Sequence, residues 1–405
     1  MTSRPRIALC MEYPVTQAGG VEALVVELVR GLASEFSIVL VSDDDADSVA
    51  AAGLAPLLAE HFPWRSGQGG AAEAESLAVA LKQAGVALAH FHFGGTYGWN
   101  SRTAHKCPIP ATARLGIPVV ITNHWVQPPL EGYCRASRPL WFKLAMFPFA
   151  WCSRLRVLHS ARLELTVSIH NRNVVRDSFW PLRSKIGHMY HSSLDEHEPE
   201  PALRAEDRPP VILEVATIAR RKGQRVLIEA FDCLAARYPE WTLRLVGYVG
   251  DKDYFEEIRT MDATRRLGDR LEFTGPLSRT ETAEAMFGAA IFVLPSLSEG
   301  LPLSVQEAVF RGCACVATSV SGIPELIEHG RTGLLVPPND VTATAEALDQ
   351  LITDRALRRQ LARRGRASII AKGMTRQGML RRHVELYRSL LAQKGSATAD
   401  GNEDR

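Results

Sequence analysis

Short apolar runs alternate with longer amphipathic segments along most of this chain, and this alternation constrains the fold more than any other feature. Uniformly apolar runs of about four to eight residues are typical of strands that helices cover on both faces of a parallel sheet. We therefore predict an α/β fold. In the first half we expect strands at Ile7–Cys10, Ser37–Val41, Val86–Phe91 and Val119–Thr122, and helices at Val21–Ala33, Ala71–Ala84 and Ser101–Leu115.

The same alternation repeats in the second half. A segment rich in proline and acidic residues, His197–Pro210, separates the halves and is typical of an exposed linker. We predict two doubly wound domains with a ligand cleft at the carboxyl ends of their strands. The expected strands are Val211–Ala216, Leu243–Val246, Leu271–Phe273, Ile291–Leu294, Cys315–Thr318 and Leu334–Val336; the expected helices are Gln224–Arg237, Tyr254–Leu267, Arg279–Phe287, Leu303–Arg311, Ile323–His329 and Val341–Thr353.

Composition excludes several classes of protein. Of 405 residues, 47 are Lys or Arg and 45 are Asp or Glu, so the net charge of +2 gives no case for a nucleic-acid partner. The seven cysteines have no zinc-ligand spacing, and we expect a reducing, cytoplasmic compartment. No apolar stretch approaches the roughly 18 residues of a membrane span. Five apolar residues before Glu12 are too few for a signal peptide.

The most informative segment follows the strand expected at Ile291–Leu294. Pro302 suits the first turn of a helix, and Gly300 just before it lets the backbone approach a ligand. Free N–H groups at a helix start bind anions. Glu299 lies in the loop, and Glu307 lies two turns into the helix, where its two oxygens can accept from both hydroxyls of a ribose. Alternatively, the acids only complement the helix dipole.

Glu299 and Glu307, eight residues apart, resemble the E-x7-E signature of retaining glycosyltransferases of family 4 (group 1), which have the GT-B fold. The resemblance covers most of the chain. It implies two Rossmann-like domains facing a cleft: an acceptor domain at 1–195, and a nucleotide-sugar domain at 196–374. We expect a helix at 375–393 to pack back on the first domain, before a disordered tail at 394–405. Further matching segments are Gly19–Glu22, Leu245–Gly247, Phe273–Gly275, Gly322–Glu325 and Gly330–Val336.

The resemblance also implies roles for single residues. Glu307 would hold the ribose of the sugar donor, Glu299 would contact hydroxyls of the transferred sugar, and Lys222 would neutralise the leaving diphosphate without a metal or other cofactor. Backbone N–H groups would bind the sugar or pyrophosphate at Gly300, Leu301 and Leu303.

One position departs from the family pattern. Thr217 stands where the family usually has an arginine, five residues before the lysine, and a hydroxyl cannot replace a guanidinium. Arg220 or Arg221 could reach the phosphates instead. Otherwise, the site would stabilise the leaving group less well.

In the first half, His124 follows a strand where the family carries a histidine facing the donor sugar, and the loop at Gly19 and Gly20 could lie against the diphosphate. A structural histidine and an ordinary turn are the alternatives. His90 and His92 share one strand face, but no third residue suggests a metal site there.

For the mechanism, we favour same-face attack through an oxocarbenium-like state, because no carboxylate in the first half is placed as a nucleophile. The acceptor stays open between a glycan, a lipid-linked molecule and a small molecule. Arg138–Arg156 mixes aromatic and basic residues and suits either an interfacial segment or a buried helix pair lining the cleft; Arg355–Arg388 suits a solvated helix face or membrane contact. Peripheral contact at the inner face of a membrane is therefore compatible with the cytoplasmic location.

Four other functions compete with a transferase. They are a GT-B epimerase, a phosphorylase, a metal-dependent GT-A transferase using Asp43–Asp45 or Asp251–Asp253, and a non-catalytic nucleotide-sugar-binding subunit, which the Thr217 departure favours.

Overall fold

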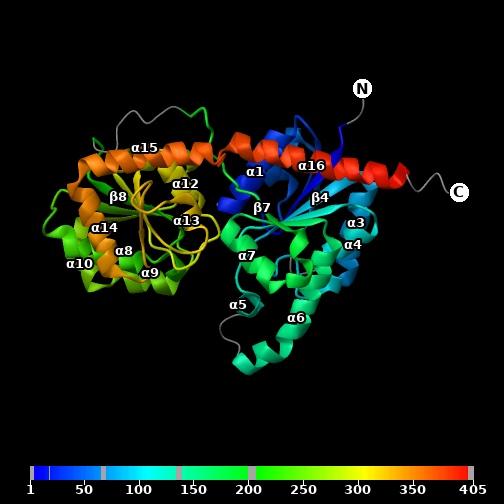
Figure 1. The fold of residues 1–405 in the computed structure, drawn as a ribbon, viewed down its shortest axis with the longest axis horizontal. Coiled ribbons are helices and arrows are strands. Elements are labelled where there is room, and N and C mark those ends of the chain that lie inside the picture. Colours follow the sequence, from blue (N-terminus) through cyan, green and yellow to red (C-terminus); the bar gives the residue numbers. More distant parts are fainter. Residues whose placement is uncertain (1–3, 18, 65–69, 134–138, 199–206, 400–405) are drawn as a thin grey trace. The chain divides into compact units, whose positions relative to one another are not determined.

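The computed structural model describes residues 4–17, 19–64, 70–133, 139–198 and 207–399. The chain divides into two compact units, which we call unit 1 (Met1–Ser193 with Arg376–Arg405) and unit 2 (Leu194–Thr375). Each unit is a parallel β-sheet flanked by helices (Figure 1). The predicted class of two parallel α/β sheets is thereby confirmed.

The sheet of unit 1 has seven parallel strands in the order β3-β2-β1-β4-β5-β6-β7. Its central strands are buried along almost their whole length, as expected for strands covered on both faces. The strands are β1 Arg6–Met11, β2 Ser37–Ser42, β3 Leu58–Pro63, β4 Val86–Phe93, β5 Val119–Asn123, β6 Leu163–Thr166 and β7 Ile186–His188; the helices are α1 Gly20–Leu32, α2 Ala46–Ala51, η1 Ala55–Leu57, α3 Ala71–Gln83, η2 Ala104–Lys106, α4 Pro108–Arg114, α5 Pro129–Tyr133, α6 Leu140–Ser160, α7 Ile169–Ser178, η3 Trp180–Lys185 and α16 Arg376–Ala399.

The four strands predicted in this half form the centre of the sheet, whereas three outer strands were not predicted. Side chains of β3 are half-buried or exposed, and β7 has only three residues. The apolar run of β6 is interrupted by Glu164, whose buried carboxylate pairs with Arg154 of α6 at 2.5 Å. The single helix predicted over Ser101–Leu115 is wrong, because a short 3-10 turn ends before Pro108 starts α4.

The sheet of unit 2 has six parallel strands in the order β10-β9-β8-β11-β12-β13, and all six were predicted. The predicted helix Tyr254–Leu267 is instead two helices, since Met261 has extended backbone angles. The strands are β8 Val211–Val215, β9 Thr242–Val246, β10 Leu271–Gly275, β11 Ile291–Leu294, β12 Ala314–Thr318 and β13 Leu334–Val336; the helices are η4 Arg220–Lys222, α8 Gln224–Ala235, α9 Lys252–Arg259, α10 Asp262–Leu267, η5 Gly268–Arg270, α11 Arg279–Gly288, α12 Leu303–Phe310, α13 Ile323–Leu326, α14 Val341–Thr353 and α15 Arg355–Ala371.

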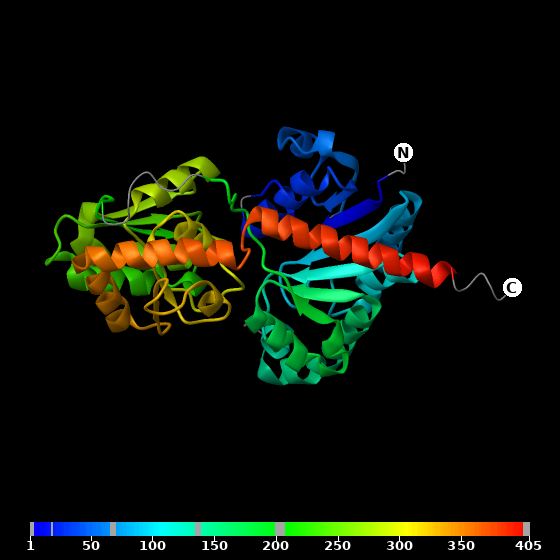
Figure 2. The same ribbon diagram turned by 45° about the horizontal axis from the view of Figure 1, so that its top comes forward.

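The last helix, α16, packs on unit 1, against α1 and β4 (Figures 1 and 2). Tyr387 of α16 is fully buried, and its ring meets the edge of Phe36 with 5.7 Å between centroids. The helix continues to Ala399, past Lys394 where a disordered tail was predicted. Residues 400–405 lie outside the described residues, as do residues 199–206 of the predicted linker.

Within the described part of the chain, no helix is both long enough and apolar enough to cross a membrane.

Candidate functional site

Two loops at the carboxyl ends of β8 and β11 form the candidate site in unit 2. The first contains η4 and turns at Gly223, whose φ of +75° suits glycine. A Cβ at Gly223 would lie 2.2 Å from the carbonyl oxygen of Pro295 in the second loop. In addition, the N–H of Leu297 donates to the carbonyl of Arg221 at 2.8 Å. The two loops are therefore held in direct contact by their backbones.

Glu299 is the charged centre of this site. Its Oε1 lies 2.5 Å from Nζ of Lys222, and its Oε2 lies 3.3 Å from Nη1 of Arg221. The hydroxyl of Ser296 donates to the same Oε1 at 2.6 Å. Burial, the largest influence, acts to raise the pKa of Glu299, but Lys222, Arg221 and Ser296 together lower it below its ordinary value. The site therefore holds an ionised carboxylate between two cations.

The other predicted residues of the second loop lie around the start of α12. Gly300 and Leu301 are buried in the loop, and Leu303 is the first residue of the helix. Glu307 lies about one turn into α12, instead of the two turns expected from the sequence, because the helix begins only at Leu303. Its side chain is 21% exposed, and one of its oxygens is 3.9 Å from Nη1 of Arg311. The structure thus brings Lys222, Glu299 and the start of α12 together in unit 2.

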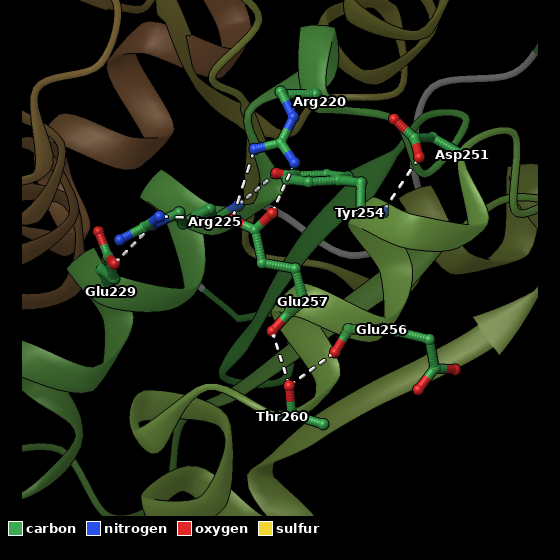
Figure 3. A network of polar contacts seen from close by, with 8 residues as sticks. All are labelled: Arg220, Arg225, Glu229, Asp251, Tyr254, Glu256, Glu257 and Thr260. Atoms are coloured by element: carbon green, nitrogen blue, oxygen red, sulfur yellow. Dashed lines mark hydrogen bonds and ion pairs between the residues drawn. The ribbon is translucent and has the colours of Figure 1, made fainter.

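Arg220 faces a different part of unit 2. Its Nη2 pairs with Oε2 of Glu257 on α9 at 2.5 Å, and its guanidinium lies over the ring of Tyr254, 5.0 Å from the centroid (Figure 3). Arg225 also pairs with Glu257, at 3.4 Å. The hydrogen bond from Arg220 is the main cause that lowers the pKa of Glu257. Of the two candidate arginines, Arg221 is therefore the one beside Glu299.

A buried carboxylate under the first loop was missed in the sequence. Glu214 lies on β8 with 1% of its surface exposed, and burial raises its pKa well above the ordinary value. The amide of Gln224 donates to Glu214 at 3.3 Å and to the carbonyl of Thr217 at 3.1 Å. This pair fixes the backbone at Thr217, the position that departs from the family pattern. The sequence could have indicated this buried carboxylate, because Glu214 is a single glutamate inside the apolar run of β8.

The remaining predicted site residues belong to unit 1. Gly19 and Gly20 are at the start of α1, and Gly19 has extended backbone angles. His124 follows β5 and is 7% exposed. Its Nε2 lies 3.0 Å from Nδ1 of His92, and its backbone N–H donates to the carbonyl of Phe93 at 3.0 Å. The neighbouring strand therefore fixes the orientation of the His124 ring.

His124 is one member of a closed ring of five buried imidazoles, which we call the histidine ring. Successive centroids are 4.3, 5.3, 5.1, 5.5 and 5.8 Å apart around the ring. Desolvation by burial is the main cause that lowers the pKa of every member, to about 3 for His124 and about 4 for His383. In order, the members are His90, His92, His124, His191 and His383.

Hydrogen bonding in the histidine ring also favours the neutral form. Both nitrogens of His90 meet hydroxyls, at 2.5 Å for Tyr387 and 2.7 Å for Thr122. Both nitrogens of His191, and Nε2 of His92 and His383, have no partner among the described residues. Protonation would add N–H donors without acceptors. Among all the residues that the structure describes, no group of three or more His, Cys, Asp or Glu side chains could hold a metal ion.

Comparison with known families identifies the fold and its relatives. Residues 18–187 match the family described as Glycosyltransferase Family 4, and residues 195–368 match Glycosyl transferases group 1. The chain belongs to glycosyltransferase family 4. One relative in this family is the putative colanic acid biosynthesis glycosyltransferase WcaL of Escherichia coli, which is 34% identical over 50% of this chain and 47% of its own length. The chain thus spans about half the length of the curated relatives that it matches.

Solved structures of other proteins share the fold of this chain. A glycosyltransferase from Rickettsia africae has a TM-score of 0.74 at 18% identity and covers 96% of this chain and 99% of its own. HepE of Anabaena, crystallised in complex with UDP-glucose, has a TM-score of 0.72 at 17% identity, covering 95% of this chain and 99% of its own. At such identities the likeness concerns the fold alone.

Proposed function

We propose that this family 4 protein transfers a sugar, a hexose in the simplest case, from a nucleoside diphosphate sugar to an acceptor with retention of configuration. The observation that carries the proposal is the pairing of Lys222 and Arg221 with Glu299 at the loops after β8 and β11. Two cations beside the start of α12 provide a site for a diphosphate, because cations and free helix N–H groups both stabilise phosphate oxygens.

The residues of unit 2 have separate tasks in this proposal. Lys222 and Arg221 stabilise the negative charge that develops on the leaving diphosphate, so the reaction is metal-independent. Glu299, kept ionised by the same two cations, accepts hydrogen bonds from hydroxyls of the transferred sugar. Glu307 binds the ribose diol from α12. The departing phosphate takes the proton of the acceptor hydroxyl, and no protein nucleophile is required.

His124 of unit 1 is the proposed contact to the donor sugar from the acceptor domain, with Gly19 and Gly20 as a loop for the diphosphate. Because its pKa is lowered to about 3, His124 is neutral at physiological pH and can donate one hydrogen bond and accept another. The acceptor class is a glycan, a lipid-linked molecule or a small molecule. A lipid-linked acceptor would be met by peripheral contact with a membrane.

The test is a donor panel of UDP-, GDP- and ADP-sugars, measuring binding and slow hydrolysis with and without EDTA. We expect hydrolysis of one sugar donor that EDTA does not change. Lys222→Met should lower that rate about 100- to 1,000-fold, the usual effect of removing one group that stabilises transition-state charge. The matched control is Lys252→Met, at the first residue of α9. Hydrolysis that requires a divalent metal, or a rate unchanged in Lys222→Met, would refute the assignment.

A second candidate function is a non-catalytic subunit that binds nucleotide sugars. The observation in its favour is Thr217, whose carbonyl is tied to Gln224 at the position of the family arginine. Binding of a sugar donor without turnover of any acceptor would favour this candidate.

A further inference from the structure

Helix α6 of unit 1 has an unusual distribution of apolar residues. Its second half is buried at Ala150, Arg154 and Val157, as expected for a helix packed on a domain. Its first half, residues 140–149, extends away from the sheet of unit 1 (Figure 1). Every exposed residue between 140 and 149 is apolar, which is the reverse of an ordinary surface helix.

Apart from Met146, the exposed residues of this half form a continuous face. They recur at spacings of one, four, five, eight and nine residues, which place them on one side of a helix. Trp141 and Phe149 are each 70% exposed, Leu140 is 63% exposed and Leu144 is 53% exposed. We call this surface the α6 face. It comprises Leu140, Trp141, Leu144, Ala145, Pro148 and Phe149.

The charges around the α6 face have one sign. From position 132 to position 162 the sequence contains no aspartate or glutamate, but it contains six arginine or lysine residues. One of these, Arg154, is buried and paired with Glu164, whereas Arg156 and Arg162 are exposed. Lys143 lies within the exposed half itself. An apolar face with tryptophan and surrounding positive charge complements an anionic lipid surface.

We propose that the α6 face docks on the surface of a bilayer that contains anionic phospholipid, with Trp141 and Phe149 inserted at the headgroup level. A second copy of the chain fits the same face less well, because a two-fold contact would bring each basic segment against its own copy. This docking does not depend on the transfer reaction, since it uses no residue of the donor site.

The experiment is co-sedimentation of the full chain with vesicles of phosphatidylcholine alone or of phosphatidylcholine and phosphatidylglycerol at about 70:30. We expect at least about tenfold tighter binding to the anionic vesicles, reduced at about 0.5 M salt. The variant W141S/F149S should bind at least about tenfold more weakly. The control V79S/I370S removes two exposed apolar residues outside α6, at 43% and 41% exposure, and should bind like the wild type.

Two further measurements keep the proposal testable. Brominated lipid should quench tryptophan emission of the wild type and should quench Trp141→Phe much less. Titration with the sugar donor should give the same affinity for W141S/F149S and the wild type, which separates this proposal from the proposed function. Equal binding to neutral vesicles, equal loss in both double variants, or a dimer that W141S/F149S dissociates without any vesicle binding would each overturn it.

Discussion

Acid should destabilise unit 1 through the histidine ring. The pKa of every member is lowered in the fold, so below about pH 6.5 the unfolded chain binds more protons than the native state. The stability from neutral burial is therefore complete above pH 6.5 and is lost as the pH falls. The charged groups near the ring do not reverse this sign, since Arg382 lowers the pKa of His191 and of His383 further.

The magnitude follows from the folded pKa values. Each histidine that stays neutral in the folded state lowers the unfolding free energy by about 1.4 kcal/mol for every pH unit below 6.5. At pH 5, His124 with a pKa of about 3 and His383 with a pKa of about 4 therefore each cost about 2 kcal/mol. Together these two residues account for about 4 kcal/mol at pH 5, a large part of the roughly 5–15 kcal/mol by which a typical domain is stable. The pKa values of His90, His92 and His191 are also lowered, so these residues add to the loss, and we expect the unfolding free energy of unit 1 to fall steeply between about pH 6.5 and pH 5.

Tryptophan fluorescence is a suitable assay, because six of the seven tryptophans lie in unit 1 and only Trp241 lies in unit 2. Urea unfolding would be followed from pH 7.5 to pH 5. His383→Leu removes one titrating group from a helix and should reduce the slope by about 1.4 kcal/mol per pH unit. His105→Leu, at an exposed position, is the control and should not change the slope. An equal slope in His383→Leu and the wild type would refute the reasoning.

Three further predictions concern single contacts. Glu307→Ala should weaken binding of the sugar donor strongly in a titration, and unchanged affinity would exclude its ribose contact. Arg154→Met should cost about 3–5 kcal/mol in unfolding free energy, because it leaves the carboxylate of Glu164 buried without its cation, whereas replacing both partners by apolar residues should restore much of that loss. Gly223→Ala should lower the melting temperature of unit 2 and the affinity for the sugar donor together, since a Cβ would meet Pro295 at a positive φ; a change in neither would contradict the close approach of the two loops.

The sequence predicted the centres of both sheets but not the edges of the first. A strand buried on both faces must be apolar, so its pattern is visible in the sequence alone. Strand β6 could not be predicted, because Glu164 interrupts its apolar pattern. The residue that makes the burial of Glu164 possible, Arg154, comes from a different element. For the same reason the surroundings of α6 were ambiguous. A helix that is apolar on most sides fits a buried pair or a lipid surface, and only the burial of the adjoining half distinguishes them.

In the candidate site, too, only the features that depend on local sequence could be predicted. The loop at Glu299 and the helix at Glu307 could be predicted, because proline and glycine mark where a helix starts. The choice between Arg220 and Arg221 could not, since it depends on Glu257 of α9. His90 and His92 were expected to share a face, and their rings are stacked at 4.3 Å. His191 and His383 join them from segments far away in the chain, which no local pattern could indicate.

The position of α16 has a consequence for biosynthesis. Unit 1 is built from two separate stretches of chain, with all of unit 2 inserted between them. A ribosome therefore completes unit 2 before it releases the helix that supplies His383 and Tyr387 to unit 1. Until then, His90 of the nascent chain lacks its tyrosine hydroxyl, and the surface that α16 covers is open to chaperones. A truncated product that stops before Arg376 would have a finished second unit beside an unfinished first one.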